Sequence, residues 1–204
     1  MSSVLVTGGA GYIGSHTVKA LKKAGHQVVV YDDLSAGHRE AARFADAFIQ
    51  GAIHDTERLR NAFREHDVDA VMHFAAWLSV GDSVRDPAGY YRNNVLGALS
   101  VLDAMVAENV HRFVFSSTAA VFGNPVETPI TEDHPKRPIN AYGETKLAIE
   151  RALPHYERAY GLKSVILRYF NAAGADPEGD LGEDHSPEQH LIPRAIDAAL
   201  GRDS

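Results

Sequence analysis

The stretch Val4-Leu5-Val6-Thr7-Gly8-Gly9-Ala10-Gly11-Tyr12-Ile13-Gly14 joins an apolar run rich in β-branched residues to a cluster of glycines. Apolar residues at helical spacing follow as far as Ala24, so the pattern predicts a strand, a tight turn and a helix. Glycine allows the sharp bend and lets a phosphate approach the backbone N–H groups. The first N–H groups of the helix have no partner within it and carry a partial positive charge, which favours a pyrophosphate.

A second predicted strand, Gln27–Tyr31, ends at Asp32. This aspartate lies about 20 residues beyond the glycines, where a carboxylate that binds ribose is expected. The glycines can be read as Gly9-x-Gly11-x-x-Gly14 or as Gly8-x-x-Gly11-x-x-Gly14, and either motif alone is weak. An ordinary strand–helix turn followed by a capping aspartate is the alternative. Spacing and context together favour a dinucleotide site.

The composition is that of an ordinary globular protein, with 204 residues, 45% of them apolar and 23% charged. This length suffices for one large domain, or for one domain and part of another. The net charge of −7 argues against a nucleic-acid surface. No cysteine is present, which excludes disulfides and thiolate metal sites. We find no signal-peptide pattern and no membrane-length apolar run, and therefore expect a cytoplasmic protein without a membrane partner.

Strand and helix patterns alternate along the rest of the chain. We expect further strands at 47–50, 69–74, 112–116 and 162–168, and helices at 39–45, 55–63, 87–108, 141–160 and 191–200, with a kink at Pro154. Residues 123–140, with four prolines, and the acidic segment 174–188 are expected to be loops. The order predicts an α/β fold: a doubly wound parallel sheet of about six strands in the order 3-2-1-4-5-6, with helices on both faces.

Tyr142 and Lys146 stand at positions i and i+4 of the predicted helix 141–160 and so share one face. A phenol is a poor base near neutral pH, and a neighbouring ammonium favours the phenolate, so we expect a lowered pKa for Tyr142. Ser116-Ser117-Thr118 ends a predicted strand and can place a hydroxyl beside the phenol. Tyr–Lys pairs are also common on solvated helix faces. Beside a dinucleotide turn, however, the three groups predict a proton-transfer site for an alcohol–ketone conversion.

These motifs resemble the extended short-chain dehydrogenase/reductase family and, within it, the UDP-glucose 4-epimerases. The resemblance covers essentially the whole chain. The matching stretches are Val6–His16, His73–Ala76, Val80–Val84, Tyr90–Asn94, Ser116–Gly123, Asn140–Lys146 and Leu167–Gly174.

The resemblance implies interconversion of UDP-glucose and UDP-galactose through a 4-keto sugar, with NAD as transient hydride acceptor. It implies Thr118, Tyr142 and Lys146 as catalytic residues. It places NAD against Gly8, Gly11, Tyr12, Ile13, Gly14, Asp32, Asp33, Phe74, Ala75, Asn94, Ser116, Tyr142, Lys146 and Tyr169. It places the UDP-sugar against Thr118, Tyr142, Asn171, His190 and Leu191. Residues 1–174 are then an NAD-binding Rossmann domain and 175–204 the beginning of a substrate-binding portion whose remainder is absent.

Two positions depart from the family pattern. Ala52 stands where an acid often contacts the adenine, and Leu78 stands where some epimerases carry a lysine. Both suggest altered contacts to NAD without a change in the chemistry.

Other readings stay open. A sugar-nucleotide 4,6-dehydratase is disfavoured because Ala119-Ala120 replace the Asp-Glu pair that follows the threonine in those relatives. Another nucleotide-sugar epimerase, or a truncated NAD-binding fragment without turnover, is also possible. His185 and His190 lie in a loop without further ligands, so we expect no metal site.

The two long helices, 87–108 and 141–160, carry more apolar residues than one buried face needs, namely Val95, Leu99, Leu102, Val106, Leu147 and Leu153. In resembling enzymes this pair of helices forms a dimer interface, which implies a homodimer with two-fold symmetry.

Overall fold

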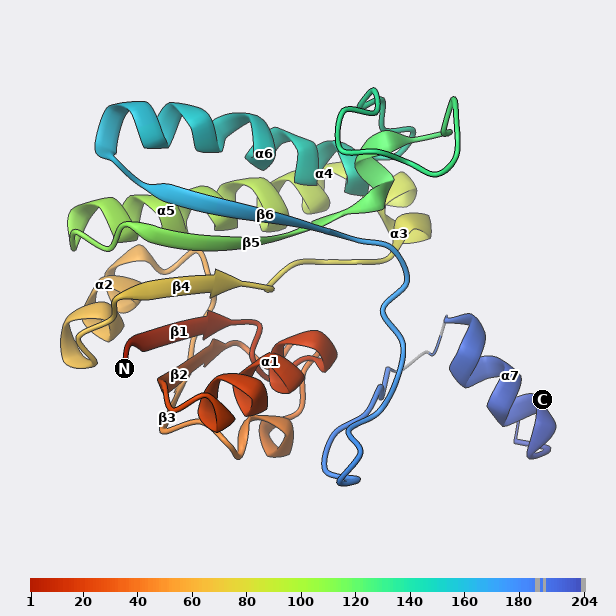
Figure 1. The fold of residues 1–204 in the computed structure, drawn as a ribbon, viewed down its shortest axis with the longest axis horizontal. Coiled ribbons are helices and arrows are strands. Elements are labelled where there is room, and N and C mark those ends of the chain that lie inside the picture. Colours follow the sequence, from red (N-terminus) through yellow and green to blue (C-terminus); the bar gives the residue numbers. More distant parts are fainter. Residues whose placement is uncertain (186–187, 189, 203–204) are drawn as a thin grey trace.

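The computed structural model describes residues 1–185, 188 and 190–202 and is built on one parallel sheet. Its strands are β1 (Ser3–Thr7), β2 (Gln27–Asp32), β3 (Ala47–Gln50), β4 (Ala70–His73), β5 (Arg112–Thr118) and β6 (Lys163–Tyr169). They lie in the order β3-β2-β1-β4-β5-β6, as Figure 1 shows. The predicted doubly wound sheet and its strand order are confirmed.

Helices cover both faces of the sheet. The larger core lies under α2 (Thr56–Glu65), α5 (Gly97–Ala107) and α6 (Ala141–Tyr160), which pack on strand residues such as Leu5, Val71 and Phe113. The smaller core lies under α1 (Tyr12–Lys23) and the short 3-10 helix η1 (Arg39–Ala42). Along β1 to β4, residues alternate between these cores, because successive side chains of a strand point to opposite faces.

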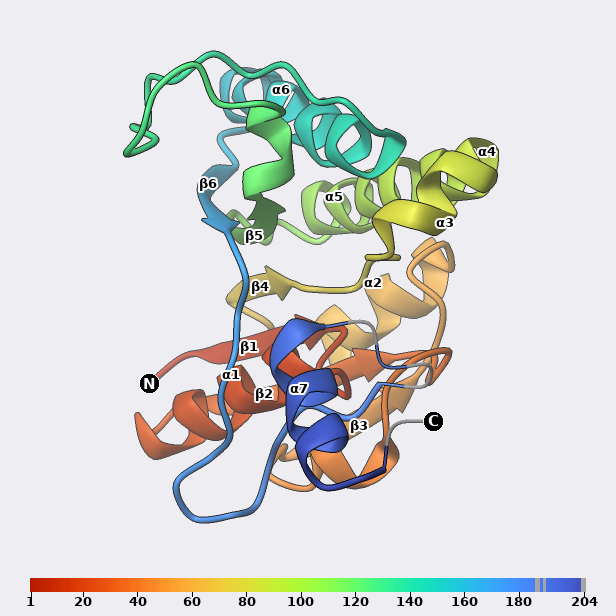
Figure 2. The ribbon, with the colours of Figure 1, turned by 90° about the vertical axis from the view of Figure 1, so that its right-hand side faces the viewer.

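The second face is covered only in part. On the face of the sheet that carries α1, Val165 and Leu167 of β6 are 56% and 38% exposed. The last helix, α7 (Leu191–Ala199), has no buried residue and lies beyond the carboxyl ends of the strands, away from this face (Figures 1 and 2). The expected covering of both faces is therefore complete over β1 and β2 and incomplete over β6. Within the described residues, no helix is both long enough and apolar enough to cross a bilayer.

The expected helix 87–108 is interrupted. The chain forms α4 (Pro87–Tyr90), a wider π-helical turn η2 (Tyr91–Leu96) and then α5, and an unpredicted helix α3 (Val80–Arg85) precedes them. The π turn turns Asn94 inward, where it is 3% exposed and bonds to the loop after β4. The turn is wider than that of an α-helix at the point where the Asn94 side chain makes hydrogen bonds to a distant segment of the chain.

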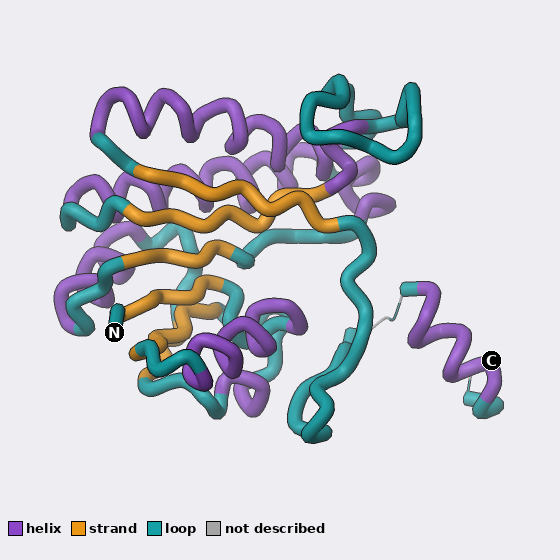
Figure 3. Tube along the Cα trace, in the orientation of Figure 1, coloured by secondary structure: helices purple, strands orange, loops and turns teal. Residues whose placement is uncertain are grey.

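Other boundaries follow local signals. Asn140 caps α6 by accepting a hydrogen bond from the Gly143 N–H at 2.8 Å, and the helix continues through Pro154 to Tyr160. The expected helix 39–45 is only the turn η1, because Ala42 alone is buried there and little packing supports a longer helix. Residues 123–140 form an irregular loop, as expected, in Figure 3.

Candidate active site

Two glycines of the β1–α1 turn are required by the turn itself. Gly8 has a φ of +70°, and a Cβ there would lie 2.5 Å from the Ala75 nitrogen. A Cβ on Gly14 would lie 2.1 Å from the Gly8 carbonyl oxygen. A side chain at either position would therefore force the backbone apart.

Gly11 is different, because the protein's own packing leaves room for a side chain. A Cβ there would meet only the Gly8 oxygen, at 3.4 Å, which is an ordinary contact. Gly11 is also the N-cap of α1 and supplies no side-chain cap, so the first N–H groups of this helix stay available. Close approach of an anion explains both features, and a pyrophosphate fits this cradle.

Asp32 lies at the carboxyl end of β2, where the spacing predicts it. The residue is 8% exposed, and its carboxylate accepts hydrogen bonds from the N–H groups of Ala10 at 3.0 Å and Leu34 at 2.9 Å. Burial raises the pKa of Asp32 although both hydrogen bonds oppose this shift. The adjacent Asp33 instead bonds to Ser35, with its carboxylate accepting from both the backbone N–H and the hydroxyl. Asp32 thus joins the glycine turn to β2.

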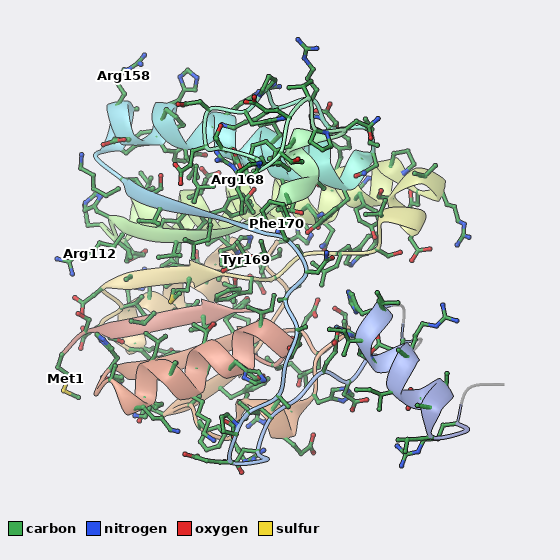
Figure 4. The ribbon with its side chains drawn as sticks, turned by 45° about the vertical axis from the view of Figure 1, so that its right-hand side comes forward. Met1, Arg112, Arg158, Arg168, Tyr169 and Phe170 are labelled. Atoms are coloured by element: carbon green, nitrogen blue, oxygen red, sulfur yellow. The ribbon has the colours of Figure 1, made fainter. Side chains whose placement is uncertain are left out.

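The predicted proton-transfer residues meet where β5 and β6 end. Lys146 is 2% exposed, and its Nζ donates a hydrogen bond to the Ser116 carbonyl at 2.8 Å. The Thr118 hydroxyl bonds to the Tyr142 phenol. From β6, Tyr169 bonds to the Ser116 side chain and lies where the chain leaves the sheet in Figure 4. Five residues singled out from the sequence thus lie at this edge in two sets of contacts, with Lys146 and Tyr169 on Ser116 and with Tyr142 on Thr118.

The direction of the Tyr142 pKa corrects an expectation. Burial raises the pKa of Tyr142, and the hydrogen bond from Thr118 offsets only part of this shift. Loss of water around the buried ammonium also lowers the pKa of Lys146 to about 7. The expected lowering of the phenol pKa is therefore wrong for this structure, because desolvation acts on both partners and weakens the charged form of each.

The cofactor-groove residues after β4 hold the turn together. The N–H of Phe74 donates to the Thr7 carbonyl at 3.0 Å, and the Ala75 backbone packs against Gly8. The Asn94 oxygen accepts from the Trp77 N–H at 2.9 Å, and its nitrogen donates to the Trp77 carbonyl at 3.1 Å and to Thr145 at 3.2 Å. Asn94 therefore braces the loop after β4 in this structure.

Other predicted residues lie apart from the phenol. Asn171, His190 and Leu191 are exposed, and within the described part of the chain no hydrogen bond joins them to Thr118, Tyr142 or Lys146. At the other end of the site, Tyr12 donates to the Gly174 carbonyl at 2.6 Å. Ile13 follows it in the first turn of α1.

The sequence analysis missed several buried polar groups. The Thr7 hydroxyl and His73 Nδ1 are 2.7 Å apart, and burial, helped by the charge of Lys146, lowers the pKa of His73 to about 3. The ammonium of Lys19 pairs with Asp176 at 2.6 Å and with Asp180 at 2.7 Å, which fastens the acidic loop to α1. Glu150 bonds to Ser117 and Arg168. Only Glu150 had a local signal, since it follows Lys146 by four residues.

Comparisons with known proteins agree with this fold. Residues 4–203 match the profile of the NAD dependent epimerase/dehydratase family. The chain is 54% identical to the UDP-glucose 4-epimerase of Halalkalibacterium halodurans, over 98% of this chain and 60% of that relative. It is 53% identical to the UDP-glucose 4-epimerase of Rhizobium meliloti, over 98% of this chain and 61% of the relative.

A solved structure is equally similar. The crystal structure of UDP-glucose 4-epimerase from Brucella ovis in complex with NAD gives a TM-score of 0.97 at 53% identity, over 100% of this chain and 62% of that one. The chain thus spans about 60% of the length of the curated relatives that it matches. The similarity to UDP-glucose 4-epimerases is confirmed, and the chain belongs to the NAD dependent epimerase/dehydratase family.

Proposed function

We propose that this chain forms the NAD-binding and proton-transfer part of a UDP-glucose 4-epimerase, which interconverts UDP-glucose and UDP-galactose. The observation that carries the proposal is that the buried Thr118 and Lys146 and the partly buried Tyr142 lie together at the carboxyl ends of β5 and β6. This is the edge at which ligands bind in doubly wound sheets. The room beside Gly11, where a Cβ would meet only the Gly8 oxygen at 3.4 Å, supports an anion site at the same edge.

The residues present fit NAD. Gly11 and the first N–H groups of α1, including those of Tyr12 and Ile13, would receive the pyrophosphate, and Asp32 would meet the adenosine ribose. The carboxylate of Asp32 repels a 2′-phosphate, which favours NAD over NADP. Bound NAD supplies a reversible hydride acceptor.

The chain's own residues handle the proton. Tyr142 takes the proton of the sugar 4-hydroxyl and returns it after the 4-keto sugar has turned over in the site. Thr118 donates a hydrogen bond to the phenol oxygen and so supports its anionic form. Lys146 lies on the Ser116 carbonyl, from which its ammonium can hold the nicotinamide ribose.

The substrate part of the proposal rests on fewer residues. Asn171, His190 and Leu191 are the proposed contacts to the UDP-sugar, and all three are exposed. Since the chain spans about 60% of its relatives, we propose that 1–174 is the NAD-binding domain and 175–204 the start of the substrate portion. The exposed Val165 and Leu167 favour a second candidate: the chain as it stands binds NAD without turnover.

The test begins with purified protein. We expect denaturation to release NAD, detected by mass and absorbance, and we expect added UDP-galactose to be converted to UDP-glucose. NAD without conversion supports the second candidate, and protein that neither retains nor binds NAD overturns both.

Titration with NADP should show much weaker binding than titration with NAD, and Asp32→Asn should reduce that preference. Equal affinity of the unsubstituted chain for the two cofactors would remove Asp32 from its assigned role.

A further inference from the structure

A buried carboxylate stands one helical turn beyond the proposed catalytic lysine. Glu150 follows Lys146 by four residues on α6, and Lys146 follows Tyr142 by four, so the three side chains form a row along one helix face. The side chain of Glu150 is 4% exposed. The mechanism above gives this residue no chemical task.

The row contacts three consecutive residues at the end of β5. Lys146 donates to the Ser116 carbonyl at 2.8 Å. Glu150 accepts from the Ser117 hydroxyl at 2.6 Å. Tyr142 bonds to the Thr118 hydroxyl. Along β5, the hydrogen bond of Ser117 to Glu150 thus stands between the contacts of Ser116 and Thr118, which the proton-transfer residues Lys146 and Tyr142 use.

Glu150 also ties in the neighbouring strand. Its two carboxylate oxygens accept from Nε and Nη2 of Arg168 on β6, each at 2.9 Å, and Lys136 Nζ lies 3.6 Å away. In Figure 4, Arg168 lies between β6 and α6. A bidentate ion pair of this kind restricts the relative orientation of the two side chains as well as their distance. Burial acts to raise the pKa of Glu150, but the bonds from Arg168 and Ser117 outweigh it and hold that pKa below its ordinary value.

We propose that Glu150 is a positioning residue for the hydride-transfer site. It fixes the end of β5 against α6 so that the Thr118 hydroxyl stays on the Tyr142 phenol and the Ser116 carbonyl stays on Lys146. This inference rests on the proposed function for its effect on turnover, but its geometric part does not. Glu150 itself touches neither Tyr142 nor Lys146 by a hydrogen bond among the described contacts.

The geometric part is tested by NMR on chain labelled with ¹³C at the tyrosine ring Cζ, the Tyr142 signal being identified by its loss in Tyr142→Phe. Thr118→Val provides the signal position without the threonine bond. In Glu150→Gln we expect the Tyr142 signal to move toward that position. The matched control is Glu157→Gln, which makes the same change on the same helix at an exposed pair with Lys163; its signal should stay at the unsubstituted position.

A second variant covers the case in which Glu150→Gln does not fold. Ser117→Ala removes only the link between β5 and Glu150 and leaves the Arg168 pair, so we expect a shift in the same direction. An unchanged Tyr142 signal in Ser117→Ala, or in a folded Glu150→Gln, overturns the proposal.

Turnover then separates positioning from stability alone. Where the unsubstituted protein converts UDP-galactose, we expect Glu150→Gln to lower kcat by about tenfold to a hundredfold while KM stays near its original value. Glu157→Gln should keep its kcat. A folded Glu150→Gln with unchanged kcat refutes the positioning role. Absence of conversion in the unsubstituted protein refutes the proposed function for this chain and leaves the NMR result decisive for the geometry.

Discussion

Single buried groups at the carboxyl edge of the sheet have pKa values governed mainly by the loss of water. The pKa of Lys146 is lowered to about 7 and that of His73 to about 3, whereas the pKa of Tyr142 is raised. In each case burial disfavours the charged form. Tyr142 and Lys146 therefore favour their neutral forms more strongly than the same side chains do in water.

Tyr142→Phe should abolish hydride transfer and leave NAD binding nearly intact. The phenol supplies a proton acceptor, and loss of a general base costs on the order of a hundredfold or more in rate. Lys146→Met should weaken both properties, since the ammonium is also proposed to hold the ribose. The measurements are NAD affinity and the rise in reduced-nicotinamide absorbance after addition of UDP-galactose. Undiminished epimerase activity in Tyr142→Phe would end this assignment.

His73 should make the fold sensitive to acid. Its folded pKa, about 3, lies below the unfolded value of about 6.5. The stabilisation by neutral His73 is thus complete above pH ~6.5 and is lost as pH falls toward the folded pKa. Between pH 7 and pH 5 this loss amounts to about 2 kcal/mol in the free energy of unfolding.

Urea unfolding at the two pH values measures this effect. The midpoint of His73→Gln should fall less on acidification than that of the unsubstituted chain, because glutamine stays neutral. His111→Gln, at an exposed position, should keep the original dependence. An equal fall in His73→Gln would show that other groups cause the acid sensitivity.

At the scale of elements, two helical glycines differ in whether the surrounding structure has room for a side chain. A Cβ at Gly14 in α1 would lie 2.1 Å from a carbonyl oxygen, whereas one at Gly81 in α3 would meet nothing within 4 Å. Gly81→Ala should raise stability by about 0.5–1 kcal/mol, because alanine loses less entropy in a helix. Gly14→Ala should lower it by about 2 kcal/mol or more and weaken NAD binding. Urea unfolding compares them, and a neutral Gly14→Ala would contradict the tight turn.

At the scale of the whole molecule, the apolar residues of the long helices divide into two groups. Leu102, Leu147 and Leu153 are buried within the chain, so the expectation that they exceed the needs of its own core is wrong for these three. Leu96 is 54% exposed, and Val95, Leu99 and Val106 are partly exposed. An interface between copies therefore rests on fewer residues than the sequence suggested.

We still predict a homodimer through this side of the molecule, and light scattering at micromolar concentration tests it. Leu96→Glu should then yield a monomer, since a charge buried in a two-fold interface meets its own copy. Val126→Glu, at a 70% exposed position in the loop 123–140, should leave the dimer intact. A monomeric unsubstituted chain would refute the prediction.

The sequence alone determined the strands and helices, the strand order, and a shared helix face for Tyr142 and Lys146 near the hydroxyls of residues 116–118; the choice of Thr118 came from the family resemblance. The elements follow from local periods, two along a strand and 3.6 along a helix, and from glycines where a turn needs them, and the strand order follows from right-handed crossovers. Such signals depend only on residues that are near one another in the sequence, so they can be recognised before the fold is known.

The tertiary structure decided the rest. It alone shows the π turn at Asn94, the bond from Ser117 on β5 to Glu150 on α6, and the pairing of Lys19 with Asp176. It also reverses the expected direction of the Tyr142 pKa. All four features have one physical reason. Desolvation and long-range side-chain contacts depend on which distant segments meet in the fold, and the periodicity of the sequence does not predict those meetings.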